Sequence, residues 1–252
     1  MVLPARVIDP AAVDLEHQQK LIRKLDSLIA DGAQLRGILL THHHPDHTGA
    51  VAVLSRHFDV PVHAHELTCA QLPDPDFRRG HALHDGDRLP LGVAPDGSPG
   101  WQLEVLHTPG HARDHLCFID SRYRAAIVGD MLSTLSTIII DPPEGHMATY
   151  LRSLERLLNV PLTTLYPAHG PAHRDGHALI AQYLAQRRGR EQKVFDALGH
   201  TPQSLEDLLP KAYGDVAPAV HGAALRSLLA GLEKLAEDGR AAVLPQGWVR
   251  IA

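Results

Sequence analysis

The stretch T-H-H-H-P-D-H, residues 41–47, decides how the rest of the sequence is interpreted. It comes directly after residues 37–41, an apolar run with the length and composition of a short buried strand. In an extended chain residues i and i+2 point to the same side, so the side chains of His42 and His44 can converge on one metal ion. The stretch therefore predicts a metal site at the end of a strand.

Other side chains of metal-ligating type extend this prediction. Asp46 and His47 follow the bend at Pro45 and can turn toward a second ion, whereas His43 points the other way. A further three candidates each stand just past a predicted strand: His111, Asp130 and His169. A carboxylate that ends a buried strand is costly unless it is paired, and a carboxylate can bridge two cations. One sheet edge could thus gather seven ligands.

The amino-acid composition favours metal binding by histidine and carboxylate side chains over binding by cysteine. The chain has 252 residues with 19 His and only 2 Cys. Cys69 and Cys117 match no zinc or redox spacing, so we expect two reduced thiols. The formal net charge of −5 provides no overall basic footprint for nucleic acid. With no apolar stretch of about 18 residues and no visible signal peptide, we expect no membrane partner and a cytoplasmic protein.

Predicted strands and helices alternate up to about residue 186, which indicates an α/β protein with helices covering the sheets. Apolar residues at helical spacing predict helices over residues 21–29 and 151–158. Strands are predicted at residues 60–63, 101–107, 115–120, 124–129 and 162–166. Residues 73–100 are rich in Pro, Asp and Gly and predict an irregular connector.

The pattern changes near Arg187. A helix over residues 179–198 ends at Gly199, and two more helices are expected before a β-wing at 241–251. This order is typical of a small winged-helix module. We therefore predict a first domain at residues 1–188 and a winged-helix-like α+β domain at residues 189–252.

Four motifs, in this order, resemble those of the metallo-β-lactamase fold superfamily: T-H-H-H-P-D-H at 41–47, H-T-P-G-H at 107–111, G-D at 129–130 and P-A-H-G at 167–170. The resemblance covers about residues 5–185. It implies a four-layer αββα sandwich with a dinuclear site holding two Zn²⁺ per chain, with Mn or Fe as alternatives. It also implies the ligand sets, namely His42, His44 and His111 for one metal, Asp46, His47 and His169 for the other, and Asp130 bridging both.

Such a site implies a metal-dependent hydrolase. Two cations that share a water lower its pKa toward ~7, so a bridging hydroxide would be the nucleophile. Asp46 is expected to orient it or to accept a proton as well as ligate. His115, four residues beyond a ligand, is the second catalytic candidate, through contact with substrate or leaving group. No such role is expected for His43.

The substrate stays open at this level, because the superfamily acts on esters, thioesters, lactones and phosphodiesters. H-T-P-G-H-A-R-D-H at 107–115 and the winged-helix-like tail resemble the β-lactamase-like protein 2 group, whose better-known members are single-strand-selective endoribonucleases. Residues 190–252 carry seven basic and eight acidic side chains, a net charge of −1 that weakens the case for RNA. The alternative of another class is a non-catalytic metal-binding regulatory protein.

The resemblance also implies a β-hairpin before the strand at residues 5–10. This sequence starts almost at that strand. Either the hairpin is absent, or the sequence belongs to a longer protein, or a second protomer covers the exposed sheet edge in a homodimer.

Overall fold

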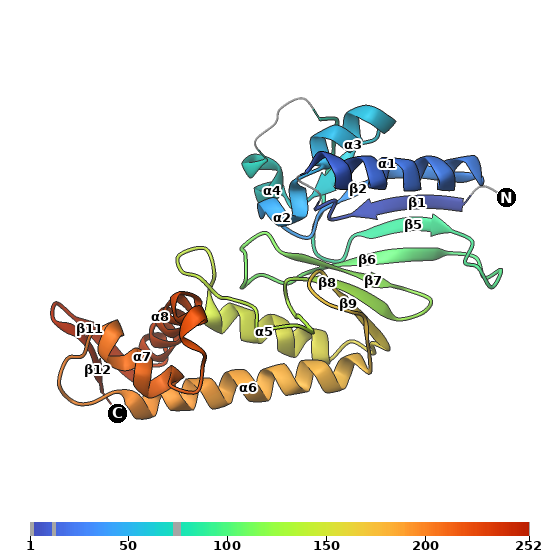
Figure 1. The fold of residues 1–252 in the computed structure, drawn as a ribbon. Coiled ribbons are helices and arrows are strands. Elements are labelled where there is room, and N and C mark those ends of the chain that lie inside the picture. The colour runs from blue at the N-terminus through green and yellow to red at the C-terminus, as the bar shows by residue number, and fades with distance from the viewer. Residues whose placement is uncertain (1–2, 12–13, 73–76, 252) are drawn as a thin grey trace.

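Two β-sheets lie face to face at the centre of the N-terminal part, and helices cover the outer face of each sheet (Figure 1). The computed structural model describes residues 3–11, 14–72 and 77–251. The first sheet is parallel, with the order β1 (Leu3–Ile8), β2 (Ala33–Leu39), β3 (Val62–Ala64) and β4 (Arg79–Ala82). The second sheet has the order β10 (His173–Arg174), β9 (Thr164–Pro167), β8 (Ala125–Gly129), β7 (Leu116–Asp120), β6 (Trp101–His107) and β5 (Arg88–Gly92).

The helices lie in two outer layers, separated by the sheets. The layer over the first sheet is made of α1 (Leu15–Ala30), α2 (Pro45–Thr48), α3 (Val51–Phe58) and α4 (Glu66–Gln71). The layer over the second sheet is made of α5 (Met147–Leu158) and α6 (Gly176–Ala197). The predicted helices at 21–29 and 151–158 lie within α1 and α5.

Separate apolar clusters fill the spaces between these layers. Leu54 belongs to the cluster under α1 and α3, Phe118 to the cluster between the two sheets, and Leu154 to the cluster between the second sheet and α5 and α6. All three side chains are fully buried. Burial of apolar area on both faces of each sheet is what holds such layers together. The predicted αββα sandwich is confirmed.

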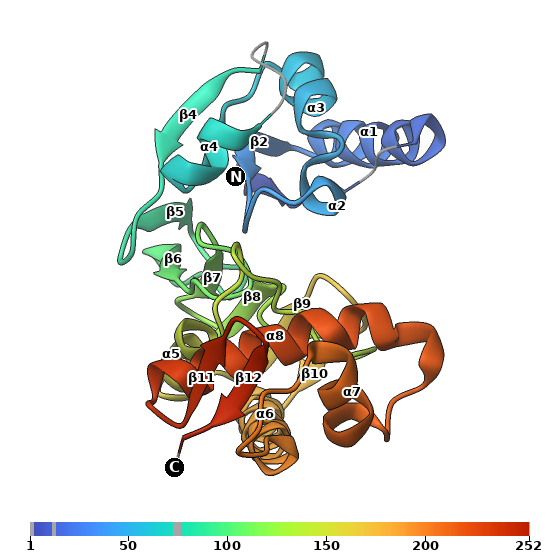
Figure 2. The same ribbon diagram turned by 90° about the vertical axis from the view of Figure 1, so that its left-hand side faces the viewer.

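The C-terminal part is a small module with its own core (Figure 2). Its elements are α7 (Leu205–Tyr213), a 3₁₀ turn at Pro218–Val220, α8 (His221–Glu237), β11 (Ala241–Leu244) and β12 (Gly247–Arg250). Leu228 and Trp248 are buried in the core that these elements share. The predicted winged-helix order is confirmed.

Helix α6 runs through both parts of the molecule (Figure 1). The predicted boundary at residues 188/189 falls inside this helix, which continues there without a break. Its buried side chains change partners instead: Leu184 packs in the core of the second sheet and Val194 packs in the C-terminal core. The two parts thus share one continuous helix in place of a linker.

One sequence-based expectation is wrong in part. The irregular connector predicted at residues 73–100 contains β4 and β5, while residues 73–76 lie outside the described residues. Both strands stand at the edge of a sheet. Edge strands are partly solvated and tolerate Gly and Pro, such as Gly80 and Pro90, so the alternation that identifies a strand is weak there. Among the described helices, none is both long and apolar enough to cross a membrane.

Candidate metal centre

The seven predicted ligands come together at one end of the sandwich. They stand beyond β2, on α2, in the loop between β6 and β7, directly after β8, and after β9. Pro45 is the first residue of α2, where a fixed φ and a missing N–H suit a helix start. The turn that it starts directs Asp46 and His47 back toward the cluster.

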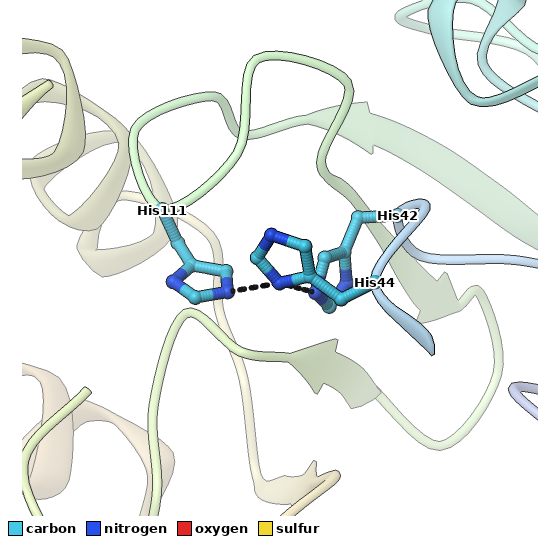
Figure 3. A group of neighbouring side chains, drawn as sticks. All are labelled: His42, His44 and His111. Carbon is cyan, nitrogen blue, oxygen red and sulfur yellow. Dashed lines mark hydrogen bonds between the residues drawn. The ribbon is translucent and has the colours of Figure 1, made fainter. Parts of the chain in front are cut away.

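His42, His44 and His111 form the first group of donors (Figure 3). Nε2 of His42 lies 2.9 Å from Nδ1 of His44, and that same Nδ1 lies 3.0 Å from Nε2 of His111. His42 is fully buried, and burial lowers its pKa well below the ordinary value. Burial also lowers the pKa of His44 and of His111. Neutral imidazoles with converging nitrogens are the form that binds a metal ion.

Asp46, His47 and His169 form the second group, and Asp130 stands between the two groups. Oδ2 of Asp130 lies 3.5 Å from Nε2 of His111 in the first group. Its Oδ1 lies 3.4 Å from Nε2 of His47 and 3.4 Å from Nε2 of His169 in the second. Asp46 approaches Nε2 of His169 to 3.4 Å. One carboxylate therefore presents an oxygen to each group, as a bridging ligand must.

Hydrogen bonds at the far nitrogen orient three of the imidazoles. Nδ1 of His42 lies 3.0 Å from the hydroxyl of Thr41, which donates to Asp9. Nδ1 of His47 lies 2.9 Å from Oδ2 of Asp9, and Nδ1 of His111 lies 2.9 Å from the carbonyl oxygen of Ile139. Because these acceptors take the Nδ1 proton, the Nε2 lone pairs face the cluster. Such outer partners are the usual support of metal-ligating histidines.

Two buried atoms at the centre, Nε2 of His47 and Oδ1 of Asp130, have no hydrogen-bond partner among the described residues. Buried polar atoms are rarely left unpaired, since the loss of hydration is not compensated. Burial lowers the pKa of His47, but the Asp130 and Asp9 carboxylates outweigh it and raise that pKa to about 10. The position thus favours positive charge, which a divalent cation can supply in place of a proton. The donor set fits two metal ions.

His115 lies behind this centre. It is fully buried, its Nε2 accepts the backbone N–H of Asp130 at 3.1 Å, and its Nδ1 lies 2.9 Å from the hydroxyl of Thr108. Burial lowers its pKa to about 3, so the ring is neutral. This placement does not suit the contact with substrate predicted for His115. It suits a positioning role, in which the ring holds the backbone of the bridging carboxylate.

His43 points away from the metal ligands, as the strand geometry predicts, and pairs with another carboxylate. Its Nδ1 lies 3.0 Å from Oδ2 of the fully buried Asp114, whose same oxygen accepts the hydroxyl of Thr68 at 2.6 Å. The hydrogen bond to Asp114 raises the pKa of His43. The pair therefore fixes the loop after β2 to the loop after β6.

We expect His43→Ala to destabilise the fold by about 1–3 kcal/mol, because a buried carboxylate loses one of its partners. Urea unfolding measures this effect, and mass spectrometry of bound metal should still find the wild-type metal content. His84→Ala, at an exposed position, is the control and should change stability by no more than about 0.5 kcal/mol. Loss of metal in His43→Ala would contradict this assignment.

Asp9 is the supporting residue that the sequence-based prediction omits. It accepts hydrogen bonds from the backbone and hydroxyl of Thr41 and holds His47. It follows the apolar strand β1 directly, at the same kind of strand end as the predicted ligands. The same positional rule would have found it. Ser133, three residues after Asp130, donates a hydrogen bond to the carbonyl oxygen of His169.

A cleft of about 700 Å³ opens beside the second group of ligands. Asp46, His47 and His169 line this cleft together with the exposed Tyr166. Its remaining lining is mainly apolar, with Ile8 and Ile127. A substrate can therefore approach the metal ligands from solvent across an apolar wall.

Fold and site together define an αββα protein with a cluster of His and Asp side chains at the strand ends that could hold metal ions. Residues 8–169 match the Metallo-beta-lactamase superfamily, and residues 204–248 match the Beta-lactamase associated winged helix domain. The chain belongs to the metallo-β-lactamase superfamily. The predictions of this fold family and of a metal-dependent hydrolase are confirmed at that level.

Characterised relatives are similar at a moderate level. The chain is 29% identical to the lactamase-like protein notP of Aspergillus sp. (strain MF297-2), over 98% of this chain and 76% of that protein. It is 29% identical to the atrochrysone carboxyl ACP thioesterase of Claviceps purpurea (strain 20.1), over 83% of this chain but only 63% of the thioesterase. It is 27% identical to the beta-lactamase-like protein 2 homolog of Caenorhabditis elegans, over 86% of this chain and 71% of that protein.

Solved structures agree with the fold. A beta-lactamase domain protein from Burkholderia ambifaria superimposes with a TM-score of 0.81 at 22% identity, over 98% of this chain and 82% of that chain. A metallo-beta-lactamase family protein from Thermus thermophilus gives 0.76 at 22% identity, over 97% and 89%. A protein solved in a di-iron-bound form is 31% identical over 68% of this chain and 84% of that chain, with a TM-score of 0.54.

Proposed function

We propose that this protein is a thioesterase with a dinuclear metal centre, zinc being the first metal to test and manganese and iron the alternatives. The observation that carries the proposal is the convergence of two donor groups on the two oxygens of Asp130. Two divalent cations held by these groups would supply Lewis acidity and an activated water. A structural zinc site would instead close around four ligands.

The residues of the chain would hold the cations and accept the proton. His42, His44 and His111 would hold one cation, and His47 and His169 the other, with Asp130 shared. Asp46 is the most exposed of these side chains and lines the cleft, so its carboxylate is suited to accept a proton from the attacking water. In thioester hydrolysis the water oxygen bonds to the carbonyl carbon, the C–S bond breaks, and the thiol leaves with a proton.

Two findings favour a thioester. A thioesterase is among the relatives, and the cleft beside the metal ligands has a mainly apolar lining. The three arginines at residues 187–190 do not form a basic surface for an RNA backbone. Arg187 is buried, Arg188 pairs with Glu155 at 2.7 Å, and Arg190 pairs with Asp215 at 2.8 Å. Their charges are therefore absent from a free basic surface, which RNA binding requires.

A substrate panel on zinc-loaded, manganese-loaded and iron-loaded protein tests the proposal. The panel contains an N-acetylcysteamine thioester, a lactone, a phosphodiester and single-stranded RNA. We expect thioester cleavage at the highest kcat/KM, followed by release of free thiol. Cleavage of RNA with the thioester left intact would instead support the endoribonuclease interpretation. Two bound ions without turnover of any substrate would support the non-catalytic regulatory protein.

A further inference from the structure

A second cavity lies between the two parts of the molecule, separate from the cleft at the metal ligands. It has a volume of about 300 Å³ and lies among the loop after β8, α6, α7 and α8. Its walls are mainly apolar, with Ile138 and Ile139 from the loop, Tyr213 from α7, and Ala223 from α8. Arg187 of α6 also lines it. Small-molecule sites have this character, an apolar hollow with a few polar groups.

Arg187 is an unusual residue for such a wall, because only 6% of its surface is exposed. One guanidinium nitrogen donates to the carbonyl oxygen of Ile138, and the group lies 5.1 Å from the centre of the Tyr150 ring. Its Nε has no hydrogen-bond partner in residues 3–11, 14–72 and 77–251. Within the described part of the chain, no carboxylate forms an ion pair with it, although its helix neighbours Arg188 and Arg190 are both paired.

A buried cation without a counter-charge is costly, because it loses hydration and gains no compensating ion pair. A ligand that brings one negative charge would supply the missing partner and could accept the free Nε–H. One guanidinium matches a monoanion such as a carboxylate. The apolar walls select for a ligand whose remaining part is hydrocarbon.

The cavity is also tied to the metal centre. Ile139 lines the cavity, and its carbonyl oxygen lies 2.9 Å from Nδ1 of the ligand His111. A group bound in the cavity therefore contacts the same loop that orients His111, one of the first group of ligands.

We propose that this cavity binds an apolar monoanion, a carboxylate on a hydrocarbon group, and that the carboxylate pairs with Arg187. This site is distinct from the cleft at the metal ligands, so the proposal stands or falls independently of the thioesterase function. It places a second ligand site at the junction with the winged-helix part, whose α7 and α8 supply two walls of the cavity.

Direct binding tests this proposal without any turnover. Titration calorimetry on the metal-loaded protein compares 2-naphthoate with 2-naphthamide, which has the same ring but no charge. We expect the wild type to prefer the carboxylate by about tenfold or more, as is usual for a hydrogen bond to a charged group. Arg187→Gln should remove this preference. Arg188→Gln, on the exposed side of the same helix, should retain it.

Ala223→Leu provides a second variant that leaves the buried arginine in place. Leucine at this position narrows the cavity, so the affinity for both probes should fall by about tenfold or more. Equal affinity of the wild type for the two probes would overturn the proposal. So would an affinity for naphthoate that survives both Arg187→Gln and Ala223→Leu, because the probe would then bind elsewhere, for instance at the metals. If the charge preference depends on Arg187 but no thioester is cleaved, the thioesterase function fails and the anion site stands.

Discussion

Asp130→Ala is expected to lower hydrolytic kcat/KM by about a thousandfold or more, which corresponds to a loss of about 4 kcal/mol in transition-state stabilisation. The reason is the position of the carboxylate between the two groups of ligands. Its oxygens lie 3.5 Å from Nε2 of His111 and 3.4 Å from Nε2 of His47 and of His169. Removal of this one side chain therefore weakens both metal positions, and metal analysis should find fewer than two ions per chain.

Two further variants make this result specific. Asp130→Asn keeps an oxygen but loses the charge, so its activity should lie between that of the wild type and that of Asp130→Ala. Asp96→Ala removes a carboxylate from the turn between β5 and β6, where it pairs with Arg122 at 2.6 Å, and should leave metal content and kcat/KM unchanged. A fully active Asp130→Ala with two bound ions would disprove the bridging role.

Gly110→Ala is expected to lower the free energy of unfolding by about 3 kcal/mol or more. Gly110 has a φ of +143°, a region that side chains disfavour, and a Cβ placed there would overlap the Cα of Tyr150. Tyr150 belongs to α5 and is fully buried, so the helix backbone or the loop must move. The next residue is the ligand His111, and metal affinity should therefore fall together with stability.

Gly97→Ala separates the cost of a side chain at positive φ from the cost of the overlap with Tyr150. Gly97 also has a positive φ, +85°, but a Cβ at that position meets no atom within 4 Å. Its substitution should cost about 1 kcal/mol, the conformational term alone, and should leave metal binding intact. Urea unfolding of both variants, with metal titration, measures the difference. Equal losses of stability in the two variants would contradict the proposed contact with Tyr150.

Much of the fold was predictable because its inner strands are buried on both faces. β6 at Trp101–His107 coincides with the predicted strand, and β7 and β8 each differ from the prediction by one residue at the start. The edge strands β4 and β5 were missed, since solvated edges do not require the apolar pattern that makes a strand visible. In the second sheet, the local pattern therefore identified the inner strands β6, β7 and β8 but not the edge strand β5.

The roles of two histidines, in contrast to the positions of the inner strands, could not be predicted from the local sequence. The sequence around His115 does not distinguish a residue that contacts substrate from one that is buried behind a metal ligand. Only the packing of β6, β7 and β8 against one another places it under the backbone of Asp130. His43 likewise obtains its partner, Asp114, from a loop 71 residues away.

By itself the sequence determined which residues could bind metal, because strand ends and the alternation of side chains are local properties of the chain. Hydrophobic periodicity also indicated an α/β protein and the winged-helix order, whereas the four-layer sandwich was implied by the resemblance of the motifs. The tertiary structure alone decided which oxygen of Asp130 faces which group and which imidazoles are held by Asp9 and Thr41. It also decided that Arg187 is buried without an ion pair to any carboxylate of the described residues. These properties depend on distances between segments far apart in the chain, and no local pattern encodes such distances.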